Sequence, residues 1–157
     1  MAKSIQMWLD EYGESHQNKT NKRIHWVCVP IIFWTAMAFI YAIPTPTAFA
    51  EVSPHLNWST IGAVLVILFY ARLSVSLAVG MAAFTAFCYF TILAFDAAFA
   101  GYLVISSAVI FVIVWAAQFY GHEVEGKKPS FFKDVQYLMI GPAWLMSFIY
   151  QKLGLKY

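Results

Sequence analysis

The chain has 157 residues, of which 61% are hydrophobic and 11% are charged. A soluble globular domain carries about 25% charged residues, so this composition excludes an ordinary soluble domain and predicts an integral membrane protein. Its length predicts a single membrane-embedded domain over residues 1–157. The formal net charge of +2 is too small to indicate nucleic acid as a partner.

The N-terminal segment, MAKSIQMWLDEYGESHQNK, is polar and contains acidic residues. No apolar core precedes a small-residue cleavage site in it, so we do not expect a signal peptide. Cys28 and Cys88 each lie alone in an apolar run. This pattern predicts buried thiols rather than a disulfide framework.

Four apolar segments follow in chain order. Ile24–Ile43 has 20 residues, and a helix of that length matches a hydrocarbon core of roughly 30 Å. After a proline-rich turn region, Trp58–Leu73 forms a second and shorter segment, Ser76–Phe95 a third, and Tyr102–Tyr120 a fourth. We therefore expect an all-α membrane protein, a helical bundle with four transmembrane helices.

A fifth apolar segment, VQYLMIGPAWLMSFIY, is interrupted by Gly141 and Pro142. Proline in a helix interior removes a backbone hydrogen bond and bends the helix. We therefore predict a C-terminal helix that is re-entrant or interfacial, with a fifth membrane-spanning helix as the alternative.

Lysine and arginine residues occur on alternate loops. They precede the first apolar segment, occur at Arg72 between the second and third, and follow the fourth, whereas residues 44–57 and the turn around Asp96 contain none. Because positively charged loops favour the cytoplasmic side, the N-terminus should face the cytoplasm. The membrane would be the inner membrane of a bacterium or the endoplasmic reticulum of a eukaryote.

This topology predicts that three histidines lie at the cytoplasmic face, namely His16, His25 and His122, with His55 on the opposite side. His16 and His25 are nine residues apart, so they would face opposite sides of one straight helix. The intervening QNKTN contains residues that favour turns and helix N-caps, so we expect a bend there. Asn21 lies four residues before His25, where its amide could orient the imidazole.

The second half of the predicted site is WAAQFYGHEVEGKKP. Gln118 and His122 are four residues apart at the end of the fourth segment, and Glu123 and Glu125 follow. Histidines with a carboxylate and open positions are typical of non-haem Fe(II) sites, whereas the lack of cysteine ligands disfavours a structural thiolate zinc site. From the residues alone, a metal site and a solvated polar loop both remain open.

Two blocks of sequence carry a family resemblance. YGESHQNKTNKRIHWVCVPIIFW (12–34) and QFYGHEVEGKKPSFFKDVQYLMIGPAW (118–144) combine H-x-N-x-x-N-x-x-x-H with Q-F-x-G-H-x-x-E-G-K-x-P. In this combination the chain resembles the small membrane proteins related to the fungal 2-hydroxy fatty acid dioxygenase. The blocks cover about 50 residues, and the order of the apolar segments extends the resemblance over nearly the whole chain.

The resemblance implies an Fe(II)-dependent dioxygenase that shortens a 2-hydroxy fatty acid by one carbon with O2, in fatty acid alpha-oxidation. It implies that His16, His25 and His122 are the catalytic and iron-binding residues, and it gives His55 no such role. Glu125 lies three residues after His122, one residue closer than in the fungal protein, which leaves open whether it is a ligand. No separate organic cofactor is required.

A 2-hydroxy acid can chelate Fe(II) through its carboxylate and hydroxyl, and three histidines would leave about three of six positions open. The acyl chain would lie among the helices and membrane lipids, and basic residues would attract the acidic head group. The residues that we expect to support the ligands or bind the substrate are Asn18, Asn21, Gln118, Glu123, Glu125, Lys19, Arg23 and Lys127.

Two other function classes fit the same composition. A non-enzymatic membrane protein, either a lipid-binding scaffold or a transporter subunit, would need no metal. A transporter should place ionisable residues near the bilayer midplane, and the apolar segments carry almost none. A metal-dependent lipid hydrolase would use the same histidines but would not consume O2.

Overall fold

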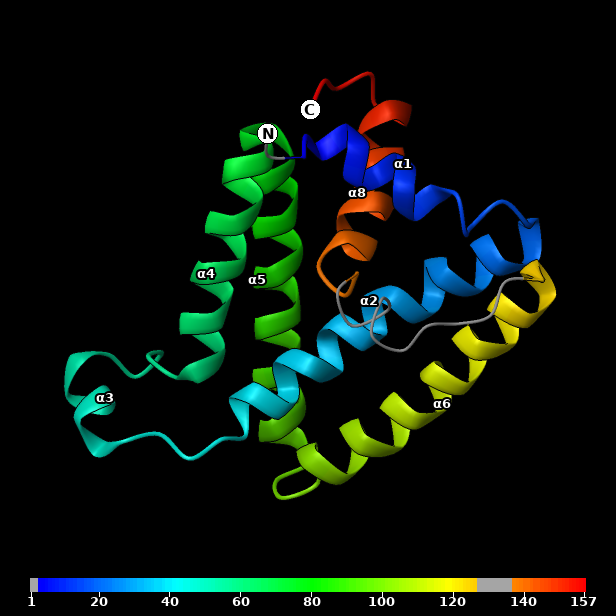
Figure 1. Cartoon of the computed structure of the whole chain (residues 1–157). Coiled ribbons are helices and arrows are strands. Elements are labelled where there is room, and N and C mark those ends of the chain that lie inside the picture. The colour runs from blue at the N-terminus through cyan, green and yellow to red at the C-terminus, as the bar shows by residue number, and fades with distance from the viewer. Residues whose placement is uncertain (1–2, 127–136) are drawn as a thin grey trace.

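The computed structural model describes residues 3–126 and 137–157, and its architecture is shown in Figure 1. The described residues form seven α-helices and no strand, which confirms the all-α prediction. Lys127, one of the predicted substrate-binding residues, lies outside the described residues. The helices are α1 (Ile5–Gly13), α2 (Lys19–Tyr41), α3 (Thr47–Val52), α4 (Trp58–Leu73), α5 (Val75–Ala98), α6 (Leu103–Glu125) and α8 (Ile140–Lys152).

Three of the described helices, α2, α5 and α6, are long and apolar enough to cross a membrane. The prediction of four spanning helices is wrong, because α4 has only 16 residues. At 1.5 Å per residue its length is about 24 Å, less than a hydrocarbon core of roughly 30 Å. Ser74 ends α4 in an extended conformation, and its side chain caps α5 by accepting a hydrogen bond from Leu77 N. The break between the two helices therefore has a local cause.

The C-terminal helix α8 has 13 residues, so the alternative of a fifth spanning helix is also wrong. Pro142 lies in the first turn of α8, where the missing backbone N–H costs no helical hydrogen bond. Pro142 is therefore compatible with the start of the short helix α8 and does not bend a longer helix. Trp144, Leu145 and Tyr150 of α8 are buried against the rest of the bundle.

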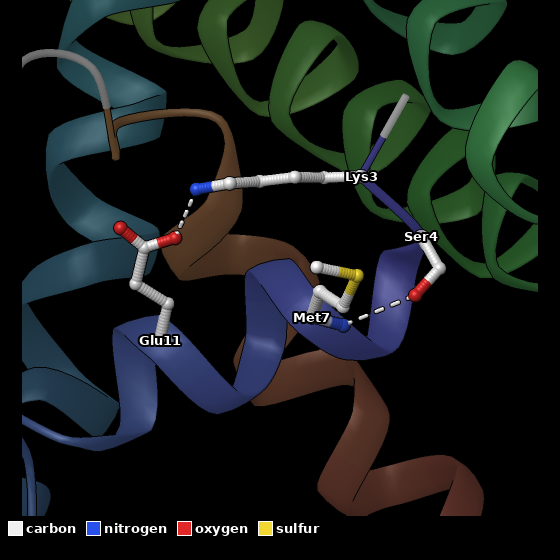
Figure 2. A network of polar contacts seen from close by, with 4 residues as sticks. All are labelled: Lys3, Ser4, Met7 and Glu11. Carbon is white, nitrogen blue, oxygen red and sulfur yellow. Dashed lines mark hydrogen bonds and ion pairs between the residues drawn. The ribbon is translucent and has the colours of Figure 1, made fainter. Parts of the chain in front are cut away.

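The N-terminal segment forms helix α1, which the sequence analysis did not predict. Ser4 caps it by accepting a hydrogen bond from Met7 N at 3.3 Å, and Lys3 forms an ion pair with Glu11 (Figure 2). Ile5, Leu9 and Tyr12 recur at the spacing of one helix face, and all three are buried. That face belongs to the same apolar core as Trp144 of α8.

Helix α2 runs through the middle of the molecule, in contact with α6 along one side and with α4 and α5 on another (Figure 1). Helices α4 and α5 pack as a pair, and α1 packs on α8. Cys28 and Cys88 are both buried free thiols, as predicted. The arrangement brings the start of α2 next to the end of α6, and these are the two segments that carry the predicted site.

One tyrosine hydroxyl holds α8 against α5. Tyr150 Oη donates to the backbone oxygen of Ser76 at 2.6 Å and accepts from the backbone N–H of Gly80 at 3.1 Å. A β-carbon on residue 80 would lie 2.9 Å from the Tyr150 ring, so the contact depends on glycine there.

We predict that Tyr150→Phe lowers the free energy of unfolding by about 1–3 kcal/mol, because buried polar groups lose their partner. Thermal unfolding in detergent measures the effect. Tyr102→Phe is the matched control, since Tyr102 is 65% exposed and should unfold as the unmodified protein does. Equal shifts of the unfolding temperature for the two variants would contradict the prediction.

Candidate metal centre

The structure brings together the three histidines at the junction of three segments. His16 lies between α1 and α2, His25 lies on α2, and His122 lies near the end of α6. Their side chains are 2%, 1% and 6% exposed, and one ligand atom from each lies within 4.8 Å of the others. His55 lies between α3 and α4, beyond the other end of α2.

The expected bend between His16 and His25 is present, slightly earlier than the QNKTN segment predicted. Helix α1 ends at Gly13, and the backbone N–H of His16 donates to the Gly13 oxygen at 3.0 Å. Asn18 then begins α2, and its side-chain oxygen accepts from Thr20 N at 2.8 Å. The N-cap role of Asn18 thus directs the chain into α2 after His16 has turned toward His25.

Backbone carbonyls orient two of the imidazoles. His16 Nδ1 lies 2.6 Å from the oxygen of Tyr12, and His25 Nδ1 lies 3.0 Å from the oxygen of Asn21. A carbonyl oxygen only accepts, so each Nδ1 must carry the proton, and each neutral ring keeps a lone pair on Nε2. A histidine that binds a metal ion commonly donates its other ring N–H in this way.

The Nε2 atom of His16 is buried and has no hydrogen-bond partner. Burying a polar atom without a partner is costly, so such an atom in a cluster of imidazoles fits a metal ligand. Desolvation by burial is the main cause that lowers the pKa of His16, to about 4. The imidazole is therefore neutral at physiological pH, which is the form that binds a metal ion.

Aromatic rings enclose this histidine. The ring of Tyr12 stacks on His16 with centroids 4.2 Å apart, and Trp144 of α8 lies 5.3 Å from it. Neither residue was predicted from the sequence to belong to the site. Tyr12 lies four residues before His16, and this spacing could have indicated that the two side chains are in contact. No local feature of the sequence indicated that Trp144 lies at the site.

The side chain of Asn21 does not orient His25, in contrast to the prediction. Its Nδ2 atom donates instead to the oxygen of Ser15 at 3.2 Å and to Glu125 Oε2 at 3.1 Å. The physical reason is that the Asn21 backbone oxygen already receives the His25 ring proton within the same helical turn. Asn21 therefore supports the site in two ways: its backbone oxygen orients His25, and its amide binds Ser15 and Glu125.

Glu125 joins the end of α6 to the segment that carries His16. Its Oε1 accepts from Gln17 N and its Oε2 from Asn18 N, both at 2.8 Å. The group of ligand atoms contains three imidazoles and no carboxylate among the described residues. Glu125 therefore holds the backbone around the site, and Glu123 is exposed on the same helix.

A close approach of α2 and α6 makes this geometry possible. A β-carbon on Gly121 would lie 2.5 Å from Asn21 Oδ1, and the Asn21 side chain is fully buried. Gly121 precedes His122, so the same turn of α6 supplies both the space and the imidazole. Gly121 was not predicted from the sequence to support the site, although small residues commonly mark close helix contacts in membranes.

A cavity of about 30 Å³ adjoins two of the three histidines, His25 and His122. Its lining includes His25, His122 and Gln118, together with apolar side chains from α2 and α6. Lys19 and Arg23 are exposed in the first turns of α2. They contribute positive charge at the surface near the site and take no part in the buried cluster.

The chain matches the family described as Mpo1-like, 2-hydroxy-palmitic acid dioxygenase Mpo1-like, over residues 2–153. The chain belongs to the Mpo1-like family. The match includes all three clustered histidines and confirms the family resemblance noted in the sequence. No curated protein and no solved structure matches the chain.

We predict that Gly121→Ala in this Mpo1-like protein separates α2 from α6, because the added methyl group overlaps Asn21 Oδ1. Overpacking of this kind costs about 1–3 kcal/mol of unfolding free energy, and affinity for Co²⁺ should also fall. Thermal unfolding and Co²⁺ absorption titration measure the two effects. Gly62→Ala is the control, since nothing beyond its chain neighbours and its own helix backbone lies within 4 Å of its β-carbon position.

We also predict that Glu125→Gln weakens Co²⁺ binding roughly 10- to 100-fold, as loss of supporting contacts does at other metal sites. The amide nitrogen of glutamine would face a backbone N–H donor where a carboxylate oxygen now accepts. Glu123→Gln removes the same charge from an exposed position and should leave the affinity unchanged. An equal loss of Co²⁺ affinity in both variants would contradict the prediction and show that only the negative charge affects binding.

Proposed function

We propose that this Mpo1-like protein is an Fe(II)-dependent dioxygenase that shortens a 2-hydroxy fatty acid by one carbon. The observation that carries the proposal is the buried Nε2 of His16, which lacks a hydrogen-bond partner within a cluster of three imidazoles. The description of the family as a 2-hydroxy-palmitic acid dioxygenase supports the choice of substrate and reaction.

His16, His25 and His122 would hold the iron. Bound Fe(II) would supply the redox chemistry by which O2 reacts with an organic acid. The chain's own contribution is to present neutral imidazoles in a fixed orientation: the carbonyl oxygens of Tyr12 and Asn21 keep the proton on Nδ1, and the surrounding aromatic rings limit the access of water. Three protein ligands would leave about three positions for substrate and O2.

The overall reaction balances without another reactant. A 2-hydroxy acid and O2 give the acid that is one carbon shorter, CO2 and water. The bond between the carboxyl carbon and the hydroxyl-bearing carbon breaks, those two carbons lose four electrons in total, and O2 accepts the four electrons. The proposed scheme therefore needs no separate organic cofactor.

We place the site at the cytoplasmic face of the membrane, with the acyl chain toward the lipid. Helices α2, α5 and α6 are long and apolar enough to cross a bilayer, and the histidines lie near the start of α2 and the end of α6. Lys19, Lys22 and Arg23 lie at the same end of α2 and would attract an acidic lipid.

The test is anaerobic purification, metal analysis, and measurement of O2 uptake with 2-hydroxypalmitic acid. We expect stoichiometric iron, O2 consumption and formation of pentadecanoic acid. Replacing His16, His25 or His122 by alanine should lower activity about a hundredfold or more, because each removes a ligand. His55→Ala is the control and should retain activity.

A protein that binds no metal under any reconstitution would overturn the proposal in favour of a scaffold. A protein that cleaves lipid with bound metal but without O2 uptake would identify a hydrolase.

A further inference from the structure

Gln118 carries a carboxamide in a largely buried position beside the histidines. It lies on α6 one turn before His122 and is only 8% exposed. No residue in the described part of the chain forms a hydrogen bond with its amide, although a carboxamide carries an acceptor oxygen and two donor protons. Its polar atoms are not among the fully buried atoms that lack a partner, so they reach accessible space where a ligand can supply hydrogen bonds.

The amide lines the cavity beside the histidines, together with His25 and His122. Val29, Ile32 and Trp115 form apolar parts of the same lining. Binding cavities commonly combine a mostly apolar wall with a few polar groups that fix the orientation of the ligand. Besides the two histidines, polar atoms in this lining come from Tyr12, Trp115, Gln118 and Tyr137. Of these residues, Gln118 is the one with a carboxamide, and it lies one helical turn before the candidate metal ligand His122.

The size of the cavity limits what can enter it. Its volume of about 30 Å³ accommodates two water-sized groups, since one water needs at least about 10–15 Å³ measured in this way. A long acyl chain does not fit in that space. Two adjacent oxygen-bearing groups do fit, and they are what the polar end of a 2-hydroxy acid offers.

We propose that Gln118 is the residue that recognises the 2-hydroxy acid, by binding its hydroxyl and its carboxylate together. The carboxamide Oε1 would accept a hydrogen bond from the 2-hydroxyl, and Nε2 would donate one to the carboxylate. This inference rests on the proposed function for the class of substrate. An unsubstituted fatty acid would leave Oε1 buried without a donor, so the site discriminates against it.

The test compares anaerobic binding of 2-hydroxypalmitate and palmitate to the iron-loaded, full-length protein in detergent, by isothermal titration calorimetry. We expect the unmodified protein to bind the hydroxylated acid roughly 10- to 100-fold more tightly, the effect of one unpaired buried polar group. Gln118→Leu should lose about tenfold or more of this preference and keep only the part that chelation of iron by the 2-hydroxyl supplies. Gln118→Met, which is closer in shape to glutamine, repeats the test if the leucine variant does not fold.

Gln151→Leu is the matched control, because Gln151 is exposed on α8 and outside the cavity. It should keep the preference for the hydroxylated acid. Iron content, measured on every variant, should stay at the unmodified level.

Two results would overturn the proposal. The first is that Gln118→Leu and Gln118→Met retain the full preference of the unmodified protein for the hydroxylated acid. The second is that they lose iron, which would make Gln118 a metal ligand instead of a substrate-binding residue. The comparison is independent of turnover: a protein that prefers 2-hydroxypalmitate through Gln118 but does not oxidise it would refute the proposed reaction and uphold the recognition. If the unmodified protein oxidises 2-hydroxypalmitate but both variants keep the full preference, the recognition by Gln118 is refuted and the proposed reaction is upheld.

Discussion

The site depends on one set of hydrogen bonds between segments more than a hundred residues apart. The Glu125 carboxylate accepts from the backbone N–H groups of Gln17 and Asn18 and from the amide of Asn21. Hydrogen bonds to a charged group stabilise by about 1.5–3 kcal/mol each, so three of them fix the end of α6 against the start of α2. His122 lies three residues before Glu125, and His16 lies one residue before Gln17, so the same contact sets the distance between their imidazoles.

Close packing makes these hydrogen bonds possible and keeps the site free of bulk water. Gly121 has no side chain, which lets the buried amide of Asn21 lie directly against α6. The same burial disfavours the charged form of His16 and leaves its Nε2 lone pair available. One arrangement of α2 and α6 therefore determines the spacing of the histidines, their protonation and their orientation, which are the properties that a metal ion requires.

The location of the site is compatible with the lipid substrate that we propose. The histidines and the small cavity lie where two apolar helices of membrane-spanning length meet polar segments, so a fatty acid can place its head group at the imidazoles and keep its chain in the lipid. Such an enzyme would select its substrate mainly by the polar end. The aromatic rings of Tyr12 and Trp144 pack against His16, and they bring α1 and α8 into the architecture of the site.

Sequence alone determined the all-α class, the family and the identity of the clustered histidines, because apolar run lengths and residue spacing are local properties. It also predicted the bend before α2, since Asn18 is a strong helix N-cap. Tertiary structure decided the rest. Pro30 lies inside α2 whereas Pro142 lies at the start of α8, a difference that depends on packing and not on the residue type. Likewise, Glu125 binds the backbone N–H groups of Gln17 and Asn18 instead of joining the imidazoles. Local sequence could not predict this contact, because its two sides lie more than a hundred residues apart in the chain.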